Sequence, residues 1–308
     1  MFKFMKFKLV FFLISAAIIV PGIVSLVKYG LKPSIDFVGG TTVQLHFTEQ
    51  HPNPDDVKDV LAGDIPGATF SYVSNGDIIA SGQAIEEGNH LHYNSSLKKA
   101  FGQFSEVSYQ VVGPAIGQTL ILKTLVAVIV AAVVITLYIA WQFKDWKFGL
   151  SAVIAMVHDS LVILGAFSLL GHFWGVEIDT LFVTAVLTTL SFSVHDTIVV
   201  FDRVRELRKL HPEMILDEVM DVAINQTLIR SLNNSLTVII MLVCLVTLAA
   251  GSVRWLAVAL LIGAVTGTYS SIFTAVPLVA VFSSLADLTK KLPKPKLPKR
   301  QARLKSTV

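Results

Sequence analysis

The chain has 308 residues, of which 53% are hydrophobic and only 15% are charged. Its apolar residues form runs of about 20, the length that a helix needs to cross the hydrocarbon core of a bilayer, and this excludes a water-soluble globular protein. The single cysteine excludes a disulfide within the chain, and the formal net charge of +3 gives no indication of nucleic-acid binding.

Six apolar stretches predict membrane-spanning helices, which satisfy their own backbone hydrogen bonds where lipid cannot. The first follows Lys3, Lys6 and Lys8, as a signal peptide would. Its run of about 19 apolar residues exceeds the apolar core of a signal peptide, and no small-residue cleavage site follows, so we predict an uncleaved anchor. The six stretches are Leu9–Val27, Leu120–Trp141, Leu150–Leu170, Ile178–Phe201, Leu228–Ala250 and Trp255–Phe282.

The distribution of positive charge predicts the orientation of these spans. With both termini in the cytoplasm, the cytoplasmic segments hold 17 lysines and arginines, and the opposite side holds 6. Multi-pass proteins carry their excess of positive charge on cytoplasmic loops, so we predict this orientation. The basic tail, residues 284–308, is explained by the topology and by anionic lipid; contact of the tail with a ribosome or a partner protein is the alternative.

Residues 28–118 form the loop that is long enough to fold, and the orientation places it outside the cytoplasm, between the first span (residues 1–27 with the N-terminus) and the other five (119–283). Alternating apolar residues and turn residues predict the order β-α-β-β-α-β, a small α+β ferredoxin-like domain. The predicted strands are Thr41–Phe47, Thr69–Val73, Ile78–Ser81 and Glu106–Val112, with a further candidate at His90–Tyr93, and the helices begin at Asn53-Pro54 and cover Ser95–Phe101.

Asp159, Asp196 and Arg230 lie inside the predicted spans, where an ionised side chain costs roughly 2.5–3.5 kcal/mol on insertion scales and therefore needs a partner. Asp196 lies near the cytoplasmic end of the fourth span, and Arg230 begins the fifth from the same side, so a pair between them is geometrically plausible. Two interpretations of Asp196 stay open: a proton relay, in which movement of the arginine changes the proton affinity of the carboxylate, and a static ion pair. For Asp159 the position favours a structural role as an acceptor for donors on neighbouring helices.

His158 and His195 each precede an aspartate. Adjacent residues on a helix point about 100° apart, so we predict that neither histidine forms a tight pair with the next residue. A His-Asp-Ser protease is disfavoured because no nucleophile lies in a G-x-S-x-G setting. His90 and His92 share one face of the candidate strand, but no cluster of Cys, His or carboxylates supports a metal site, and no glycine-rich nucleotide loop occurs. We therefore expect no enzymatic activity, no metal and no cofactor.

Several motifs resemble the SecD/SecF family of protein-export membrane proteins. The segment D-F-V-G-G after the first span resembles the D-F-x-G-G signature of the family, and V-G-P-A-I-G resembles its start of the second span. Ser193–Glu206 resembles S-I-N-D-T-I-V-x-F-D-R-x-R-E, a specific motif of the SecF branch, and Ala223–Ser231 resembles the stretch that leads into the fifth span. His195 stands where the family usually has Asn, which adds a titratable group beside Asp196. The signature residues are Asp36, Gly39, Gly40, Gly113, Pro114, Asp202 and Arg203.

The resemblance implies a fold similar to the resistance-nodulation-division transporters, and a subunit that uses the proton motive force to promote preprotein movement through SecYEG in the bacterial inner membrane. It implies SecD as the heterodimer partner, YajC and YidC as further partners, and unfolded preprotein, not nucleic acid, as the substrate. Asp196 would be the proton-responsive carboxylate and Arg230 its charged regulator, with a further acidic residue supplied by SecD. Two alternatives stay open: half of a small-molecule proton antiporter of the same superfamily, and a structural assembly subunit.

Overall fold

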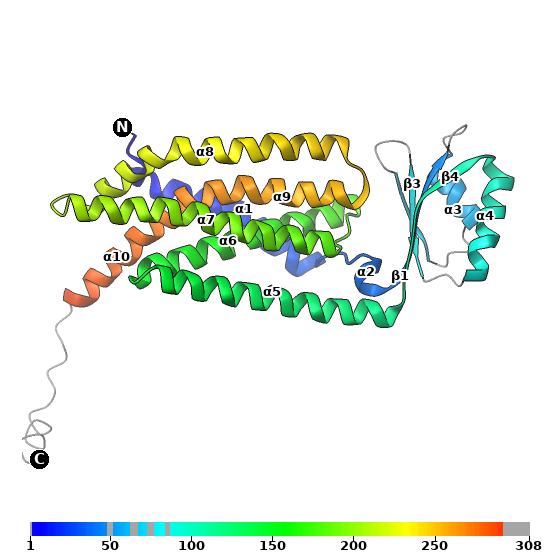
Figure 1. The fold of residues 1–308 in the computed structure, drawn as a ribbon, viewed down its shortest axis with the longest axis horizontal. Coiled ribbons are helices and arrows are strands. Elements are labelled where there is room, and N and C mark those ends of the chain that lie inside the picture. The colour runs from blue at the N-terminus through cyan, green and yellow to red at the C-terminus, as the bar shows by residue number, and fades with distance from the viewer. Residues whose placement is uncertain (1, 48–51, 62–66, 73–76, 84–86, 292–308) are drawn as a thin grey trace, which may run out of the picture.

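The structure, a computed structural model of the chain, describes residues 2–47, 52–61, 67–72, 77–83 and 87–291. It has two parts (Figure 1): a bundle of long helices, and a sheet with two short helices at one end of the bundle. The N-terminus and the last helix lie toward the opposite end of the bundle. The predicted basic tail lies outside the described residues from position 292 onward.

Six helices in the bundle are long and apolar enough to cross a membrane, which confirms the predicted number of spans. The last span contains a π-helical turn, η2, between α9 and α10, and a short 3-10 helix, η1, precedes the first. The helices are η1 (Phe4–Phe7), α1 (Lys8–Tyr29), α5 (Pro114–Gln142), α6 (Trp146–Trp174), α7 (Thr180–Leu210), α8 (Leu216–Leu248), α9 (Gly251–Ser270), η2 (Ser271–Ala275) and α10 (Val276–Lys291).

Several helices extend well beyond the apolar stretches that predicted them. The helix predicted from Leu120 begins at Pro114, where proline fits the first turn because that position needs no backbone N–H. Helix α8 begins twelve residues before Leu228, so that Arg230 lies inside the helix and not at its start. Hydropathy locates the lipid-facing part of a helix, whereas the helix itself continues for as long as its backbone bonds and caps allow.

Helices α6, α7 and α9 form the centre of the bundle. In the apolar 18-residue stretch of each span, about half of the residues are buried in α6, in α7 and in the span that α9 begins (50%, 44% and 50%), against none in that of α5 and 17% in those of α1 and α8. In Figure 1, α5 runs along the outer edge of the bundle. A charged group on the buried faces of these helices must therefore find its partners among their side chains.

The part at the end of the bundle is a four-stranded antiparallel sheet in the order β2-β3-β1-β4. Helices α3 and α4 cover one face of it (Figure 1), and a core of apolar side chains lies between them and the sheet. The predicted first and last strands are confirmed, and the two middle strands match to within two residues. The elements are β1 (Gly40–Phe47), α3 (Pro54–Leu61), β2 (Thr69–Tyr72), β3 (Ile78–Gly82), α4 (Glu87–Phe101) and β4 (Phe104–Val112).

The candidate strand at His90–Tyr93 is wrong, because these residues belong to helix α4. Tyr93 and Leu97 are both completely buried, and their spacing of four residues places them on one face of a helix. The helix predicted at Ser95–Phe101 is the second half of α4. His90 and His92 therefore do not share a strand face.

A short helix, α2 (Ile35–Val38), joins the sheet to the bundle. Ser34 caps it by accepting a hydrogen bond from the backbone N–H of Asp36. The Asp36 carboxylate in turn accepts hydrogen bonds from the backbone N–H of Thr180 (3.2 Å) and from its hydroxyl (3.0 Å), at the first residue of α7. Asp36 thus fixes the joint to a central helix of the bundle.

The backbone of this joint, α2 and Gly39, packs directly against the backbone at the start of α5, with no side chain between the two. A Cβ on Gly39 would lie 2.7 Å from the Cα of Pro114, and a Cβ on Gly117 would lie 2.7 Å from the carbonyl oxygen of Phe37. Gly39 also has a φ of +78°, a backbone conformation that favours glycine. The two glycine-containing motifs, which are more than 70 residues apart in the sequence, therefore meet in one backbone-to-backbone contact.

Candidate functional site

Asp159 lies in the middle of α6 and is almost completely buried, with 1% of its surface exposed. Its Oδ2 accepts hydrogen bonds from the hydroxyl of Ser193 on α7 (2.5 Å) and from the hydroxyl of Ser270 on α9 (2.7 Å). The π-helical turn η2 begins immediately after Ser270. The carboxylate thus connects the three central helices at the point where the last span changes its helical form.

The prediction that His158 and Asp159 cannot form a tight pair is wrong. His158 Nδ1 lies 2.9 Å from Asp159 Oδ1, and both side chains are buried. The Cα–Cβ bonds of neighbouring residues do diverge, but Nδ1 is only two bonds from the histidine Cβ, so the two side chains can turn toward one another and the ring nitrogen reaches the adjacent carboxylate. Nε2 of His158 has no hydrogen-bond partner among the described residues.

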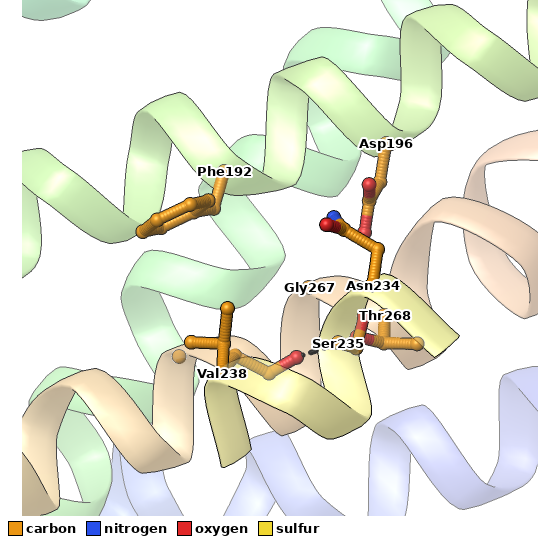
Figure 2. A pocket seen from close by; sticks show the side chains of 9 residues that line it. Phe192, Asp196, Asn234, Ser235, Val238, Gly267 and Thr268 are labelled. Carbon is orange, nitrogen blue, oxygen red and sulfur yellow. Dashed lines mark hydrogen bonds between the residues drawn. The ribbon is translucent and has the colours of Figure 1, made fainter. Parts of the chain in front are cut away.

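Asp196 lies on α7, three residues beyond Ser193, and lines a pocket between α7, α8 and α9 (Figure 2). In Figure 2 the side chains of Asp196 and of Asn234 on α8 point toward one another across this pocket. Its cavity volume of about 20 Å³ is enough for about one water molecule. The lining residues are Phe192, Asp196, Asn234, Ser235, Val238, Gly263, Ala264, Gly267 and Thr268.

Small residues of α9 explain why this pocket is narrow. A Cβ on Gly267 would lie 3.4 Å from the Cα of Ser193, so the two helix backbones are close there. On the other side, the hydroxyl of Thr268 donates a hydrogen bond to the hydroxyl of Ser235 on α8 (2.6 Å). The Ser235 and Thr268 hydroxyls are thus bonded to each other, and the polar side chains that remain facing the pocket are those of Asp196 and Asn234.

Asp196 itself has no hydrogen bond and no ion pair shorter than 4.0 Å within the part of the chain that the structure describes. The proposed partner Arg230 lies on the exposed surface of α8, four residues before Asn234, and does not reach Asp196 in this conformation. Residues four apart on a helix lie on the same face, one turn from each other. Arg230 is therefore one turn away from the position opposite Asp196, which Asn234 occupies.

Of the signature residues near the end of α7, Arg203 connects this helix to α8, and Asp202 is bonded within α7. Arg203 Nε donates a hydrogen bond to Oε1 of Gln226 on α8 (2.7 Å), and Arg205 donates to Asp202 within α7 (3.1 Å). His195, beside Asp196, is exposed on the surface of α7 and makes no hydrogen bond among the described residues. It belongs neither to the pocket nor to the Asp159 cluster.

Sequence reasoning missed Ser193, Ser270 and Asn234. Ser193 begins the fourth-span motif, but nothing in that motif links it to Asp159, and Ser270 carries no signal, because only the packing brings the two serines to Asp159. Asn234 does carry one: an amide in an apolar stretch, one turn after Arg230 on the same helical face.

Comparison with known proteins gives consistent results. Two family models match, "Protein export membrane protein SecD/SecF, C-terminal" over residues 92–284 and "SecD/SecF GG Motif" over residues 24–50. The chain is 38% identical over 292 residues to the protein translocase subunit SecF of Thermobaculum terrenum (89% of this chain, 92% of the relative). It is 34% identical over 283 residues to that of Anaerolinea thermophila, with the same coverage of both chains.

The structure resembles the solved SecDF from Thermus thermophilus, a translocon-associated membrane protein, with a TM-score of 0.83 and 29% identity. The alignment covers 92% of this chain but only 39% of the SecDF chain. Likewise, the SecDF of Bacillus subtilis is 32% identical over 284 residues, which is 86% of this chain and 36% of that protein. This chain therefore corresponds to about two fifths of a SecDF polypeptide.

Proposed function

Since this chain belongs to the SecD/SecF family of protein-export membrane proteins, we propose that it is a SecF-type subunit of the Sec translocase that couples preprotein movement through the SecYEG channel to the proton motive force. The observation that carries the proposal is the position of Asp196. Its carboxylate lines a pocket between three membrane helices and has no hydrogen bond or ion pair among the described residues.

A carboxylate in such a position is suited to binding and releasing a proton. An ionised carboxylate is unfavourable in a poorly polar environment, whereas a protonated carboxyl group is not. The protonation state of Asp196 therefore depends on which side chain lies across the pocket from it. Asp159 is different, because three neighbouring groups hold its oxygens at hydrogen-bond distance. We therefore assign Asp196 to proton coupling and Asp159, with His158, to holding α6, α7 and α9 together.

Arg230 fits the role of regulator because it lies one turn from Asn234 on the same face of α8. A displacement of α8 by one turn, about 5.4 Å along its axis, would place Arg230 opposite Asp196, where its charge favours the ionised carboxylate. The reverse displacement of α8 returns Asn234 to the position opposite Asp196 and favours the protonated form of the Asp196 carboxyl group. One charge that crosses 100 mV contributes about 2.3 kcal/mol to such a shift.

The proposed partners of this chain also follow from its family. SecDF polypeptides match this chain over about two fifths of their length, which supports a SecD-like partner that supplies the rest. Contacts with SecYEG, YajC and YidC, and the preprotein substrate, rest on family resemblance alone. The positive charges support a bacterial inner-membrane orientation with both termini in the cytoplasm and the sheet outside. The β-α-β-β-α-β order and the strand order β2-β3-β1-β4 support a ferredoxin-like domain.

The test is preprotein export in cells that carry Asp196→Asn, because asparagine keeps the shape of the side chain but cannot ionise. We expect export to be lost while the protein remains abundant and co-purifies with its SecD partner. The matched control is Asp217→Asn, the same chemical change at an exposed residue of α8 that pairs with Lys8 (3.5 Å); it should export normally. Normal export by Asp196→Asn would refute the relay, and loss of the protein itself would assign Asp196 to packing.

A further inference from the structure

A second pocket lies between the ends of α1 and α6, at the end of the bundle that carries the sheet. Its cavity volume is about 410 Å³. It lies well outside the Asp196 pocket and shares no residue with it. The residues that line it are Lys28, Tyr29, Gly30 and Lys32 from the end of α1 and the segment after it, and Ser168, Gly171 and His172 from α6.

The walls of this pocket are held by specific contacts. The ring of Tyr29 stacks on the ring of His172, with centroids 3.6 Å apart and planes 11° apart. The ammonium group of Lys28 lies 5.0 Å from the centre of the Tyr29 ring, within the range of a cation–π interaction. Below them, the hydroxyls of Ser25 and Ser168 are hydrogen-bonded at 2.8 Å, which ties α1 to α6 at the base of the pocket.

The charges at the pocket favour an anion. Lys28 and Lys32 bring two positive charges to it. Lys32 Nζ lies 3.0 Å from Glu177 Oε1 and 3.5 Å from the carbonyl oxygen of Gly175, yet 43% of its side chain remains exposed. Glu177 pairs with Lys32, and Lys28 has no ion pair among the described residues, so a positive charge remains available to a ligand with several acceptor oxygens, such as a phosphodiester.

The pocket lies at the level of the membrane where lipid headgroups are found. Helix α1 ends at Tyr29 and α6 ends at Trp174, and Phe173 and Trp174 are 66% and 72% exposed beside the pocket. Exposed aromatic residues at span ends are typical of the membrane–water interface. Val24, one turn before Lys28 on α1, and Val27 are 57% and 83% exposed, so an apolar surface begins directly below the basic pocket.

We propose that this pocket binds an anionic phospholipid, with the phosphate between Lys28 and Lys32 and the acyl chains along Val24 and Val27. Ammonium groups form charge-assisted hydrogen bonds to phosphate oxygens, so two lysines at a span end are suited to a lipid phosphate. The adjoining apolar surface requires an amphiphile and distinguishes a lipid from free phosphate. This inference does not depend on the role of Asp196.

The experiment is native mass spectrometry of the delipidated full chain in detergent, titrated separately with phosphatidylglycerol, phosphatidylethanolamine and inorganic phosphate. We expect preferential retention of phosphatidylglycerol. Lys28→Gln and Lys32→Gln should each weaken it about fivefold, which corresponds to ~1 kcal/mol for one lysine at an anionic headgroup. Lys28→Arg, which keeps the charge, should retain binding.

The matched control is Lys123→Gln, which removes one positive charge from the exposed surface of α5, away from the pocket; it should bind like the unchanged protein. Equal retention of the two lipids would overturn the proposal, as would an equal loss in Lys123→Gln and Lys28→Gln. Displacement of phosphatidylglycerol by millimolar phosphate would also overturn it and indicate a free-anion site. Thermal midpoints of all variants, which change exposed side chains, verify that they are folded.

Discussion

Gly117→Ala tests whether the joint between the sheet and the bundle depends on direct backbone contact. The new Cβ would lie 2.7 Å from the carbonyl oxygen of Phe37, 2.9 Å from the backbone N of Gly39 and 3.0 Å from the carbonyl carbon of Phe37. Ordinary contacts of a Cβ begin at about 3.4 Å. All three atoms are backbone, so no side chain can rotate away, and α2 or α5 must move by several tenths of an ångström.

The expected cost follows from two opposing effects. Overpacking of this kind costs about 1–3 kcal/mol. Alanine is a better helix former than glycine by about 0.8–1.0 kcal/mol, and this gain offsets part of the cost because Gly117 lies within α5. We expect a net loss of about 0–2 kcal/mol in the free energy of unfolding, measured by denaturant unfolding in detergent, and increased protease cleavage near the joint.

The matched control is Gly149→Ala in α6. A Cβ there would meet only the Ile139 side chain, at 4.0 Å, so helix propensity acts alone and the variant should be as stable as the unchanged protein or slightly more stable. If Gly117→Ala were as stable as Gly149→Ala, the close contact between α2 and α5 would not determine stability, and the reasoning would fail.

Two further predictions concern buried polar groups. Asp159→Ala should lower the free energy of unfolding by about 1–3 kcal/mol in a detergent-to-SDS titration, because the Ser193 hydroxyl loses its acceptor and the Ser270 hydroxyl keeps only its 3.3 Å bond to the carbonyl oxygen of Gly267; Asp196→Ala, which loses no hydrogen bond, should cost less, and equal losses would contradict this assignment. In the sheet domain, burial and the hydrogen bond to Glu106 raise the pKa of Tyr93 above its ordinary value of 10. The unfolded tyrosine therefore loses its proton first, so this stabilisation is present below pH 10 and decreases as the pH rises above it. Unfolding monitored by circular dichroism should show that Tyr93→Phe flattens this alkaline loss and that Tyr138→Phe, an exposed change in α5, does not.

Much of the architecture could be predicted because its cause is local. A run of about 20 apolar residues must become a helix in lipid, so six spans follow from hydropathy. The alternation of apolar and polar residues over Thr41–Phe47 predicts a strand with one buried face, and the structure has strand β1 there. The stretch from His90 to Tyr93 was misassigned because four residues that alternate in polarity also fit one turn of a helix.

The sequence by itself determined the number of membrane-spanning helices, which charged residues lie within those helices, and the family to which the chain belongs. Only the tertiary structure decided the partners of those charges: Asp159 with Ser193 and Ser270, which are 34 and 111 residues away, and Asp196 opposite Asn234 instead of Arg230. The reason is physical. Hydropathy fixes the depth of a helix in the bilayer, whereas its rotation about its own axis is set by packing against its neighbours, and that rotation decides which side chains meet.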